Sequence, residues 1–291
     1  MESHIFINAQ CICRKADKMP QLNEIPLYRY MVFERFLEIL DKGLFIPKAS
    51  LFNDRWEAML SHMHEYLKER NTSQLLSKYG QEEKIPSLED FYIPDIHKSI
   101  HEGKKEVYVS CWNGTHYECN AMWSLYGKEK NGILLETNAK ELTDAFTAFD
   151  ESENKEWLAV FKKMEYVLPG NHNDKVFKGK APIWSNDSNF KNKCLQVHFR
   201  FQQTFTGLSY KHISFTFENE YRLLAAHTTR GERPGKGIIL PLKPSFIKKV
   251  ILQPNSSVAF HNLVKDCLKK YGFNDVIVEK SFLDELPPLD I

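Results

Sequence analysis

The chain has 291 residues, of which 42% are hydrophobic and 13% aromatic, so one large domain can bury a substantial core. Its formal net charge of +1 gives no overall attraction to nucleic acid or to an anionic membrane. No apolar run approaches the about 20 residues that cross a bilayer, and the first residues lack the basic start and apolar core of a signal peptide. The six cysteines are irregularly spaced, which favours a reduced, cytoplasmic protein without a disulfide framework.

In the first third of the chain, the sequence pattern predicts short strands, two amphipathic helices and a polar insertion. Residues 1–25 are expected to form an irregular arm. Residues 71–105 are polar and contain two prolines, so we expect a variable lobe of small helices and loops. Between them, we expect strands at 27–30 and 44–47 and helices at 33–42 and 56–70, with Gly43 after the end of the first helix.

The rest of the chain alternates between strand-like and helix-like patterns. Strands are expected at 107–112, 132–136, 165–168, 213–226, 237–240, 247–252 and 275–278, and helices at 121–126, 139–149, 187–204 and 256–271. No repeat and no low-complexity linker divides the chain. The pattern predicts a single α+β domain over residues 1–291, built around a mixed, mostly antiparallel sheet with flanking helices.

Several familiar site motifs are missing from the sequence. No glycine-rich dinucleotide fingerprint follows a strand, and no P-loop or H-E-x-x-H sequence occurs. Cys111, His116 and Cys119 lie close together, but nothing completes a tetrahedral ligand set. We therefore expect no metal site and no ordinary Rossmann or P-loop nucleotide site.

The segment Phe215–Leu224 has the strongest pattern in the chain. Its period-two alternation predicts one strand. Glu218, Glu220 and Arg222 would then project from the same face. Such a face is either a solvated sheet surface, where the glutamates pair with Arg222 or with lysines, or the polar wall of an active site.

Three more segments place unusual side chains on predicted elements. Arg29 lies between Tyr28 and Tyr30, Ser110 and Trp112 end a strand, and Trp123 and Tyr126 are three residues apart on a helix. Each has an ordinary alternative, because Arg29 could be a surface charge, Ser110 a core hydroxyl and Trp123 a core aromatic.

These segments, in this order, resemble an uncharacterised bacterial family, domain of unknown function 2971, often found near phage-defence genes. The resemblance covers about residues 27 to 253, and Arg55 departs from it because a proline is expected there. The matching motifs are Leu27-Tyr28-Arg29-Tyr30, Phe36-Leu37-Glu38-Ile39-Leu40 with Gly43-Leu44-Phe45, Phe52-Asn53-Asp54-x-x-Glu57, Ser110-Cys111-Trp112, Met122-Trp123-x-x-Tyr126-Gly127 and Glu218-Asn219-Glu220-Tyr221-Arg222.

That family is in turn distantly similar to the ADP-ribosyltransferase fold, which implies NAD as the substrate. The analogy implies catalytic roles for Glu220 beside the reacting ribose, Glu218 at the acceptor and Ser110 bracing Glu220. In the same analogy, Tyr126 is the alternative to Ser110 at the second catalytic motif. The residues implied in cofactor binding are Arg29 (on a phosphate or ribose oxygen), Tyr30, Trp112, Trp123 and Tyr126.

The leading functional hypothesis is therefore an NAD-consuming ADP-ribosyltransferase-like enzyme, as a toxin or phage-defence effector. Its acceptor would be a protein or a nucleic acid, and a defence-system partner or antitoxin is expected. A first alternative is a non-catalytic sensor or interaction module that binds a nucleotide or a protein in the same pocket. A second is a nucleic-acid binder or nuclease, favoured by the basic segment 230–236 and by Lys243, Lys248 and Lys249.

Overall fold

The computed structural model describes residues 5–7, 22–52, 102–127, 131–153, 156–167, 204–205, 207–229, 233 and 235–285. Within these residues the main sheet has eight strands in the order β1-β6-β9-β4-β2-β5-β11-β12. These strands are β1 (Ile5–Ile7), β2 (Pro26–Val32), β4 (Val107–Asn113), β5 (Gly132–Asn138), β6 (Trp157–Lys163), β9 (Glu220–His227), β11 (Lys249–Leu252) and β12 (Ile277–Glu279). Adjacent strands are antiparallel except β11 and β12.

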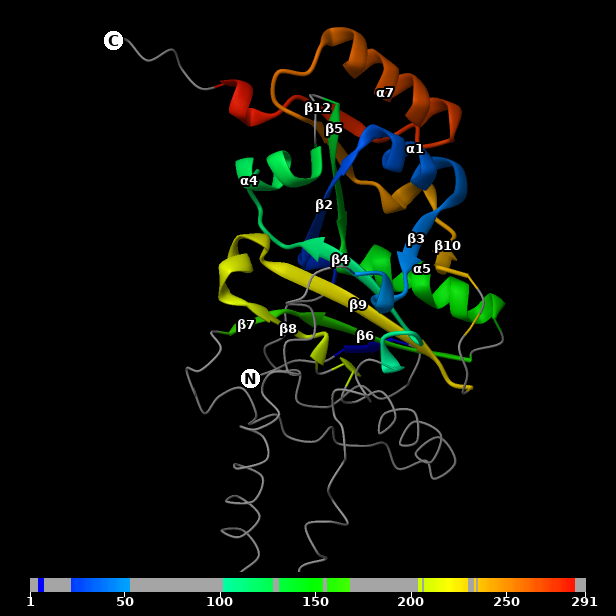
Figure 1. The fold of residues 1–291 in the computed structure, drawn as a ribbon. Helices are drawn as coiled ribbons and strands as arrows, with labels where there is room; N and C mark the ends of the chain where they lie inside the picture. Colours follow the sequence, from blue (N-terminus) through cyan, green and yellow to red (C-terminus); the bar gives the residue numbers. More distant parts are fainter. Residues whose placement is uncertain are drawn as a thin grey trace, which may run out of the picture.

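The sheet divides into two halves between β2 and β4. Strand β2 pairs with β5 over seven residues, but its register with β4 consists of one pair, Tyr28 with Asn113. Figure 1 shows β2 and β5 running steeply, whereas β4, β9 and β6 run across the molecule. The two halves therefore diverge from a single junction, and Arg29 directly follows that junction on β2.

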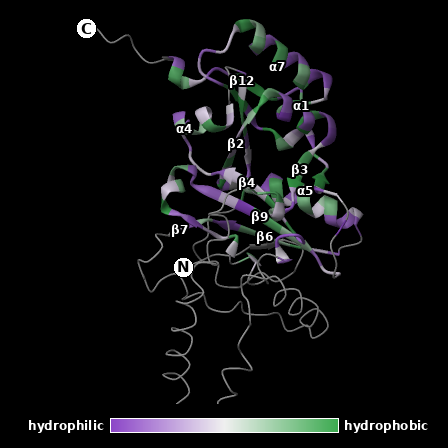
Figure 2. Cartoon of the chain, in the orientation of Figure 1, coloured by the Kyte–Doolittle hydropathy of each residue, from purple (hydrophilic) through white to green (hydrophobic). Residues whose placement is uncertain are grey.

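Helices α1 (Phe33–Lys42), α5 (Ala139–Ser152) and α7 (Val258–Lys270) contribute to the largest hydrophobic core. Phe36, Phe146 and Val264 from these helices are all buried in it, together with Leu135 and Leu223 from the sheet. The helices expose charged residues on their other sides, and Figure 2 shows the alternation of hydrophilic and hydrophobic positions along α7. This amphipathic pattern is what allowed their prediction from sequence.

The opposite face of the sheet carries two smaller cores. One lies against β4, β6 and β9 and contains Leu208 and Tyr210. The other lies against β2 and β5 and contains Tyr30, Met122 and Trp123. Met122 ends the short helix α4 (Asn120–Met122), which continues into the wider turn η4 (Trp123–Gly127).

The structure confirms the α+β class and the mostly antiparallel sheet, and helix α1 has the expected bounds with Gly43 at a φ of 102°. Strand β6 was not predicted from the sequence. Strand β1, which pairs with β6, lies in the segment that was expected to be an irregular arm. The predicted helix at 56–70 and most of the helix at 187–204 and of the lobe at 71–105 lie outside the described residues. The remaining short elements are β3 (Leu44–Pro47), β7 (Glu165–Val167), β8 (Tyr210–His212), β10 (Gly237–Leu240), and the turns η1 (Leu22–Glu24), η2 (Ala49–Leu51), η6 (Pro244–Phe246) and η7 (Phe282–Glu285).

The predicted strand at 213–226 is wrong in its first half. Residues Ile213–Glu218 form a 3-10 helix, η5, and β9 begins only at Glu220. Asn219 separates them with a φ of 38° and a ψ of 54°, in the left-handed region that asparagine tolerates better than most residues. Glu218 and Glu220 are therefore not two positions of one strand, and their proximity depends on this turn.

Asn219→Val should lower the free energy of unfolding by about 1–2 kcal/mol, because a β-branched side chain is disfavoured in the left-handed conformation. Asn219→Gly should cost less, because glycine adopts a positive φ readily. Urea denaturation of both variants checks this, and an equal loss in the two would contradict the assigned role of the turn.

Candidate active site

A buried ion pair at the start of β9 organises the candidate site. Arg222 donates from Nε to Glu220 Oε1 at 2.7 Å and from Nη2 to Glu220 Oε2 at 3.0 Å. The same guanidinium donates from Nη1 to the Leu208 carbonyl at 3.0 Å. Arg222 is 0% exposed and Glu220 is 4% exposed. Both oxygens of the Glu220 carboxylate are thus held by one planar fork, a geometry that suits arginine.

Glu218 completes an acidic couple beside this pair. Lys211, on β8, donates from Nζ to Glu218 Oε2 at 2.6 Å and lies 3.5 Å from Glu220 Oε2. The hydroxyl of Tyr126, in η4, donates to Glu218 Oε1 at 3.4 Å. Tyr126 is 42% exposed. Figure 1 shows α4 and the segment before β9 on the same side of the molecule. Glu218 therefore faces a tyrosine that solvent reaches.

Backbone contacts fix the turn that brings the two glutamates together. Asn113 donates from its side chain to the Glu218 carbonyl at 2.5 Å, and the Gly114 N–H donates to the Asn219 carbonyl at 2.9 Å. On the other side, the Glu220 N–H donates to the Tyr166 hydroxyl at 2.8 Å. The end of β4 and strand β7 thus hold the couple in place.

The two carboxyl groups have opposite electrostatic environments. Burial raises the pKa of Glu218 above its usual range, although the Lys211 ammonium partly opposes this shift. Burial also acts to raise the pKa of Glu220, but the charge and hydrogen bonds of Arg222 outweigh it, and the pKa of Glu220 is lowered. Burial and the Glu218 charge raise the pKa of Tyr126 to about 12. Such divergence between neighbouring acids is typical of acid–base sites.

The site residues predicted from sequence divide between the two faces of the sheet. Directly paired residues share a face, and Glu220 pairs with Asn113 whereas Ser110 pairs with Leu223. Ser110 and Trp112 therefore lie on the helix-covered face, opposite Glu220. The predicted role of Ser110 in bracing Glu220 is wrong, since its hydroxyl instead accepts a hydrogen bond from Trp112 Nε1 at 2.9 Å.

Arg29 also lies on the helix-covered face. Its guanidinium carbon is 5.5 Å from the centre of the Trp112 ring, and its neighbours on β2, Leu27 and Met31, belong to the large core. Arg29 Nη1 is buried and has no hydrogen-bond partner among the described residues. Burial lowers the pKa of this guanidinium. The expectation that Arg29 and the glutamates share one hollow is therefore wrong, because they project from opposite faces.

The remaining predicted aromatic residues lie on the same face as Glu220. Trp123 is 2% exposed and packs edge-on against Tyr30, with 4.9 Å between ring centres. Its Nε1 donates to Glu118 at 2.8 Å, and the Tyr30 hydroxyl accepts from the Cys119 N–H at 2.9 Å. Trp112, on the helix-covered face, is 1% exposed in the large core. These three rings are core residues, and Tyr126 alone of the predicted aromatic residues lies at the rim.

Sequence reasoning missed three residues that build the site. The alternative in which the glutamates pair with Arg222 or with lysines is what the structure shows, although the bidentate contact of Arg222 depends on the strand that starts at Glu220. Lys211, Tyr166 and Asn113 come from other elements, and no local pattern marks them. The basic segment at 230–236 lies mostly outside the described residues, and within it Arg233 Nη2 contacts His227 Nδ1 at 2.7 Å.

No group of three metal-ligating side chains occurs in the part of the chain that the structure describes. Cys111, Cys119 and Cys267 form no disulfide bond among the described residues. In the same part of the chain, no helix combines the length and apolar character that a membrane crossing needs.

The chain is thus an α+β protein with an ion-paired acidic couple at one end of its divided sheet. The family model described as "Protein of unknown function (DUF2971)" matches residues 122–223, which confirms the resemblance to this family. The matched region includes Trp123, Tyr126, Glu218, Glu220 and Arg222.

One solved structure, "Thermus sp. 2.9 DarT in complex with NAD+", aligns with 10% sequence identity over 90% of this chain and 97% of that chain. The TM-score is 0.32, so the two structures share too little geometry for features to be transferred between them. No curated protein matches the sequence.

Arg222→Met should lower the free energy of unfolding by about 3–5 kcal/mol, because it leaves the Glu220 carboxylate buried without its partner. The double variant Glu220→Leu with Arg222→Met should recover most of this loss, since no buried charge then remains unpaired. Urea denaturation of the two variants and the wild type measures the difference. If Arg222→Met lowered the free energy of unfolding by less than about 1 kcal/mol, this would contradict the claim that the buried Glu220 carboxylate depends on Arg222.

Proposed function

We propose that the protein is an NAD-consuming enzyme of the ADP-ribosyltransferase kind, with Glu218 as its acting carboxylate. The observation that carries this proposal is the Glu218 carboxyl group, which is buried, raised in pKa and directed at the half-exposed Tyr126. The sequence resemblance supports NAD as the substrate. The setting as a toxin or phage-defence effector, the protein or nucleic-acid acceptor, and a partner or antitoxin rest on that resemblance alone.

The reaction breaks the bond between C1′ of the ribose and the nicotinamide nitrogen. The electron pair leaves with nicotinamide, and positive charge develops on the ribose, as in glycoside cleavage. A carboxylate held beside the ring stabilises this charge. The acceptor then bonds to C1′ through oxygen or nitrogen, and its proton passes to Glu218 as general base. When water is the acceptor, the product is free ADP-ribose.

The geometry changes the role expected for Glu220. Both of its oxygens are engaged by Arg222 and the residue is 4% exposed, so Glu220 is poorly accessible to a ribose hydroxyl. Glu220 is instead a positioning residue, which together with Arg222 and Lys211 fixes the charge around Glu218. Lys211 occupies Oε2 of Glu218 and leaves Oε1 on the side of Tyr126. A ligand hydroxyl can replace the 3.4 Å contact of Tyr126 at that oxygen.

Glu218→Gln should abolish nicotinamide release from NAD while leaving the fold intact, because glutamine keeps the shape of the side chain but is no base. The matched control is Glu34→Gln, which changes an exposed glutamate of α1 and should leave turnover unchanged. Chromatographic detection of nicotinamide measures the rate, and circular dichroism checks the fold. Wild-type turnover in Glu218→Gln would rule out the assigned role.

The locked Glu220 also favours a second candidate, a non-catalytic module that binds a nucleotide. If the protein is such a module, the wild type should bind NAD saturably, as measured by calorimetry, and should release no nicotinamide at any enzyme concentration.

Turnover should fall on acidification at a pH above the usual range of a glutamate. A base works when ionised, and burial raises the pKa of Glu218, so activity is present above that pKa and lost as the pH falls through it. Lys211→Met removes a positive charge that lowers this pKa, so the acidic limb should move to higher pH. The pH profile of kcat/KM measures the limb, with Lys265→Met on exposed α7 as the control. A limb that moves to lower pH in Lys211→Met would contradict the assignment.

A further inference from the structure

The segment that carries Tyr126 has little regular structure to hold it in place. Helix α4 has three residues and makes no side-chain capping contact at its start. Helices this short are not stable by themselves in water. Within residues 120–127, the only buried side chains are those of Met122 and Trp123, whereas Tyr126 is 42% exposed. The position of Tyr126 beside Glu218 therefore depends on how these two neighbours are anchored.

Trp123 is anchored by a buried carboxylate that accepts three hydrogen bonds from uncharged groups. Trp123 Nε1 and Ser281 Oγ both donate to Glu118 Oε2, at 2.8 and 2.6 Å, and the Phe282 N–H donates to Glu118 Oε1 at 2.8 Å. Glu118 is 7% exposed and Ser281 is 0% exposed. Hydrogen bonds to an ionised acceptor are roughly twice as strong as those between neutral groups. Glu118 therefore joins η4 to the C-terminal turn η7.

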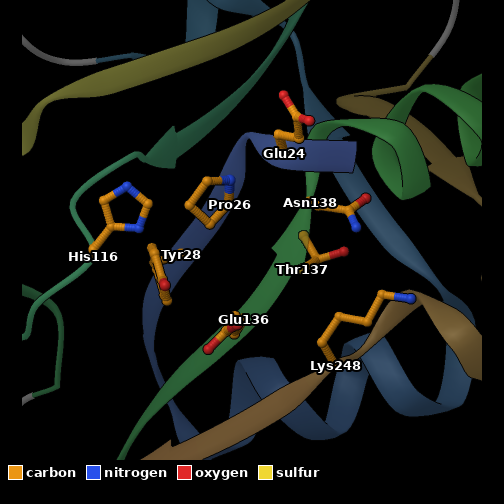
Figure 3. A pocket seen from close by; sticks show the side chains of 8 residues that line it. All are labelled: Glu24, Pro26, Tyr28, His116, Glu136, Thr137, Asn138 and Lys248. Atoms are coloured by element: carbon orange, nitrogen blue, oxygen red, sulfur yellow. The ribbon is translucent and has the colours of Figure 1, made fainter. Parts of the chain in front are cut away.

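The chain after β4 brings Glu118 to this place by crossing β2. His116 lies beside Tyr28 of β2 at the hollow drawn in Figure 3. Three residues later, the Cys119 N–H donates to the Tyr30 hydroxyl at 2.9 Å. The residue that directly follows Glu118 is thus fixed to β2, next to the small core that contains Trp123.

The C-terminal turn is attached at both of its ends. Ser281 Oγ accepts from the Leu283 N–H at 3.1 Å, and Leu283 packs against the small core. Asp284 Oδ1 accepts from the Asn255 N–H at 2.7 Å. Figure 1 shows α4 between this turn, drawn in red, and the yellow segment before β9 that carries Glu218. One short segment therefore separates the C-terminal turn from the acidic couple.

We propose that Glu118 is a positioning residue of the candidate site, which holds Trp123 and thereby keeps Tyr126 beside Glu218. Tyr126 follows Trp123 by three residues in the same turn, so a displacement of the indole also displaces the phenol. The C-terminal turn then supports the site, although its own side chains do not contact Glu218. The effect on turnover rests on the proposed function, whereas the contacts of Glu118 do not.

Amide hydrogen exchange of the whole protein tests the anchor. The glutamine of Glu118→Gln has one oxygen, so either Trp123 Nε1 or the Phe282 N–H loses its acceptor and faces an NH2 group. Exchange in residues 120–127, followed by mass spectrometry, should become at least about tenfold faster, because a charge-assisted hydrogen bond is lost. Ser281→Ala removes one donor from a distant part of the sequence and should accelerate exchange in the same residues by a smaller factor.

The titration of Glu218 tests whether the anchor acts on the site. Burial raises the pKa of Glu218, so a displaced Tyr126 should admit water and move the titration midpoint toward its usual value in both variants. Carbon-13 NMR of labelled glutamate side chains measures the midpoint. The matched control is Glu141→Gln on α5, where Glu141 accepts from Ser245 Oγ at 3.0 Å and Lys248 Nζ at 2.8 Å. It should change neither the midpoint nor exchange in residues 120–127.

Two results would overturn the proposal. The first is exchange in residues 120–127 that neither Glu118→Gln nor Ser281→Ala accelerates. The second is a Glu218 midpoint that stays the same in both variants, because Glu118 would then be a purely structural residue. Ser281→Ala decides alone if Glu118→Gln does not fold. Neither measurement uses NAD, so failure here is distinguishable from failure of the proposed reaction.

Discussion

The bidentate ion pair between Arg222 and Glu220 is the interaction on which the candidate site depends. A buried carboxylate is costly unless a cation and further hydrogen bonds compensate it. Arg222 supplies both oxygens of Glu220 with partners and uses its remaining arm to bind the Leu208 carbonyl. Because the first residues of β9 are fixed in this way, the Asn219 turn can hold Glu218 beside Glu220. The ion pair thus stabilises Glu220 in its charged form and leaves Glu218 as the acid whose proton is easier to retain.

The pleat of the sheet places on opposite faces two sets of side chains that the sequence analysis had assigned to one site. Successive residues of a strand point to opposite faces, so a shift of one position changes the side on which a group acts. Arg29, Ser110 and Trp112 lie on the helix-covered face, whereas Glu220 and Tyr28 lie on the other. This separation is why the proposed chemistry is assigned to Glu218 with Tyr126 and not to Glu220 with Arg29.

Much of the fold could be predicted because its elements have regular hydrophobic periods. The amphipathic helix α1 and the strand β4 follow their expected bounds closely, since burial alone specifies each of them. The segment before β9 was mispredicted because its residues alternate in hydrophobicity, whereas a 3-10 helix and the left-handed Asn219 carry no such signal. Lys211 was missed because it reaches Glu218 through tertiary packing. The face on which Arg29 lies depends on the register with β4, which no local pattern determines.

The most direct test of this account is the titration of the two carboxyl groups. Carbon-13 NMR of labelled glutamate side chains can follow both, with Glu218→Gln and Glu220→Gln used to assign the signals. The account predicts that Glu218 titrates above the usual range of glutamate and that Glu220 titrates below it. Titration of both groups together at an ordinary pKa, or in the reverse order, would contradict the ion-pair arrangement from which the proposed chemistry follows.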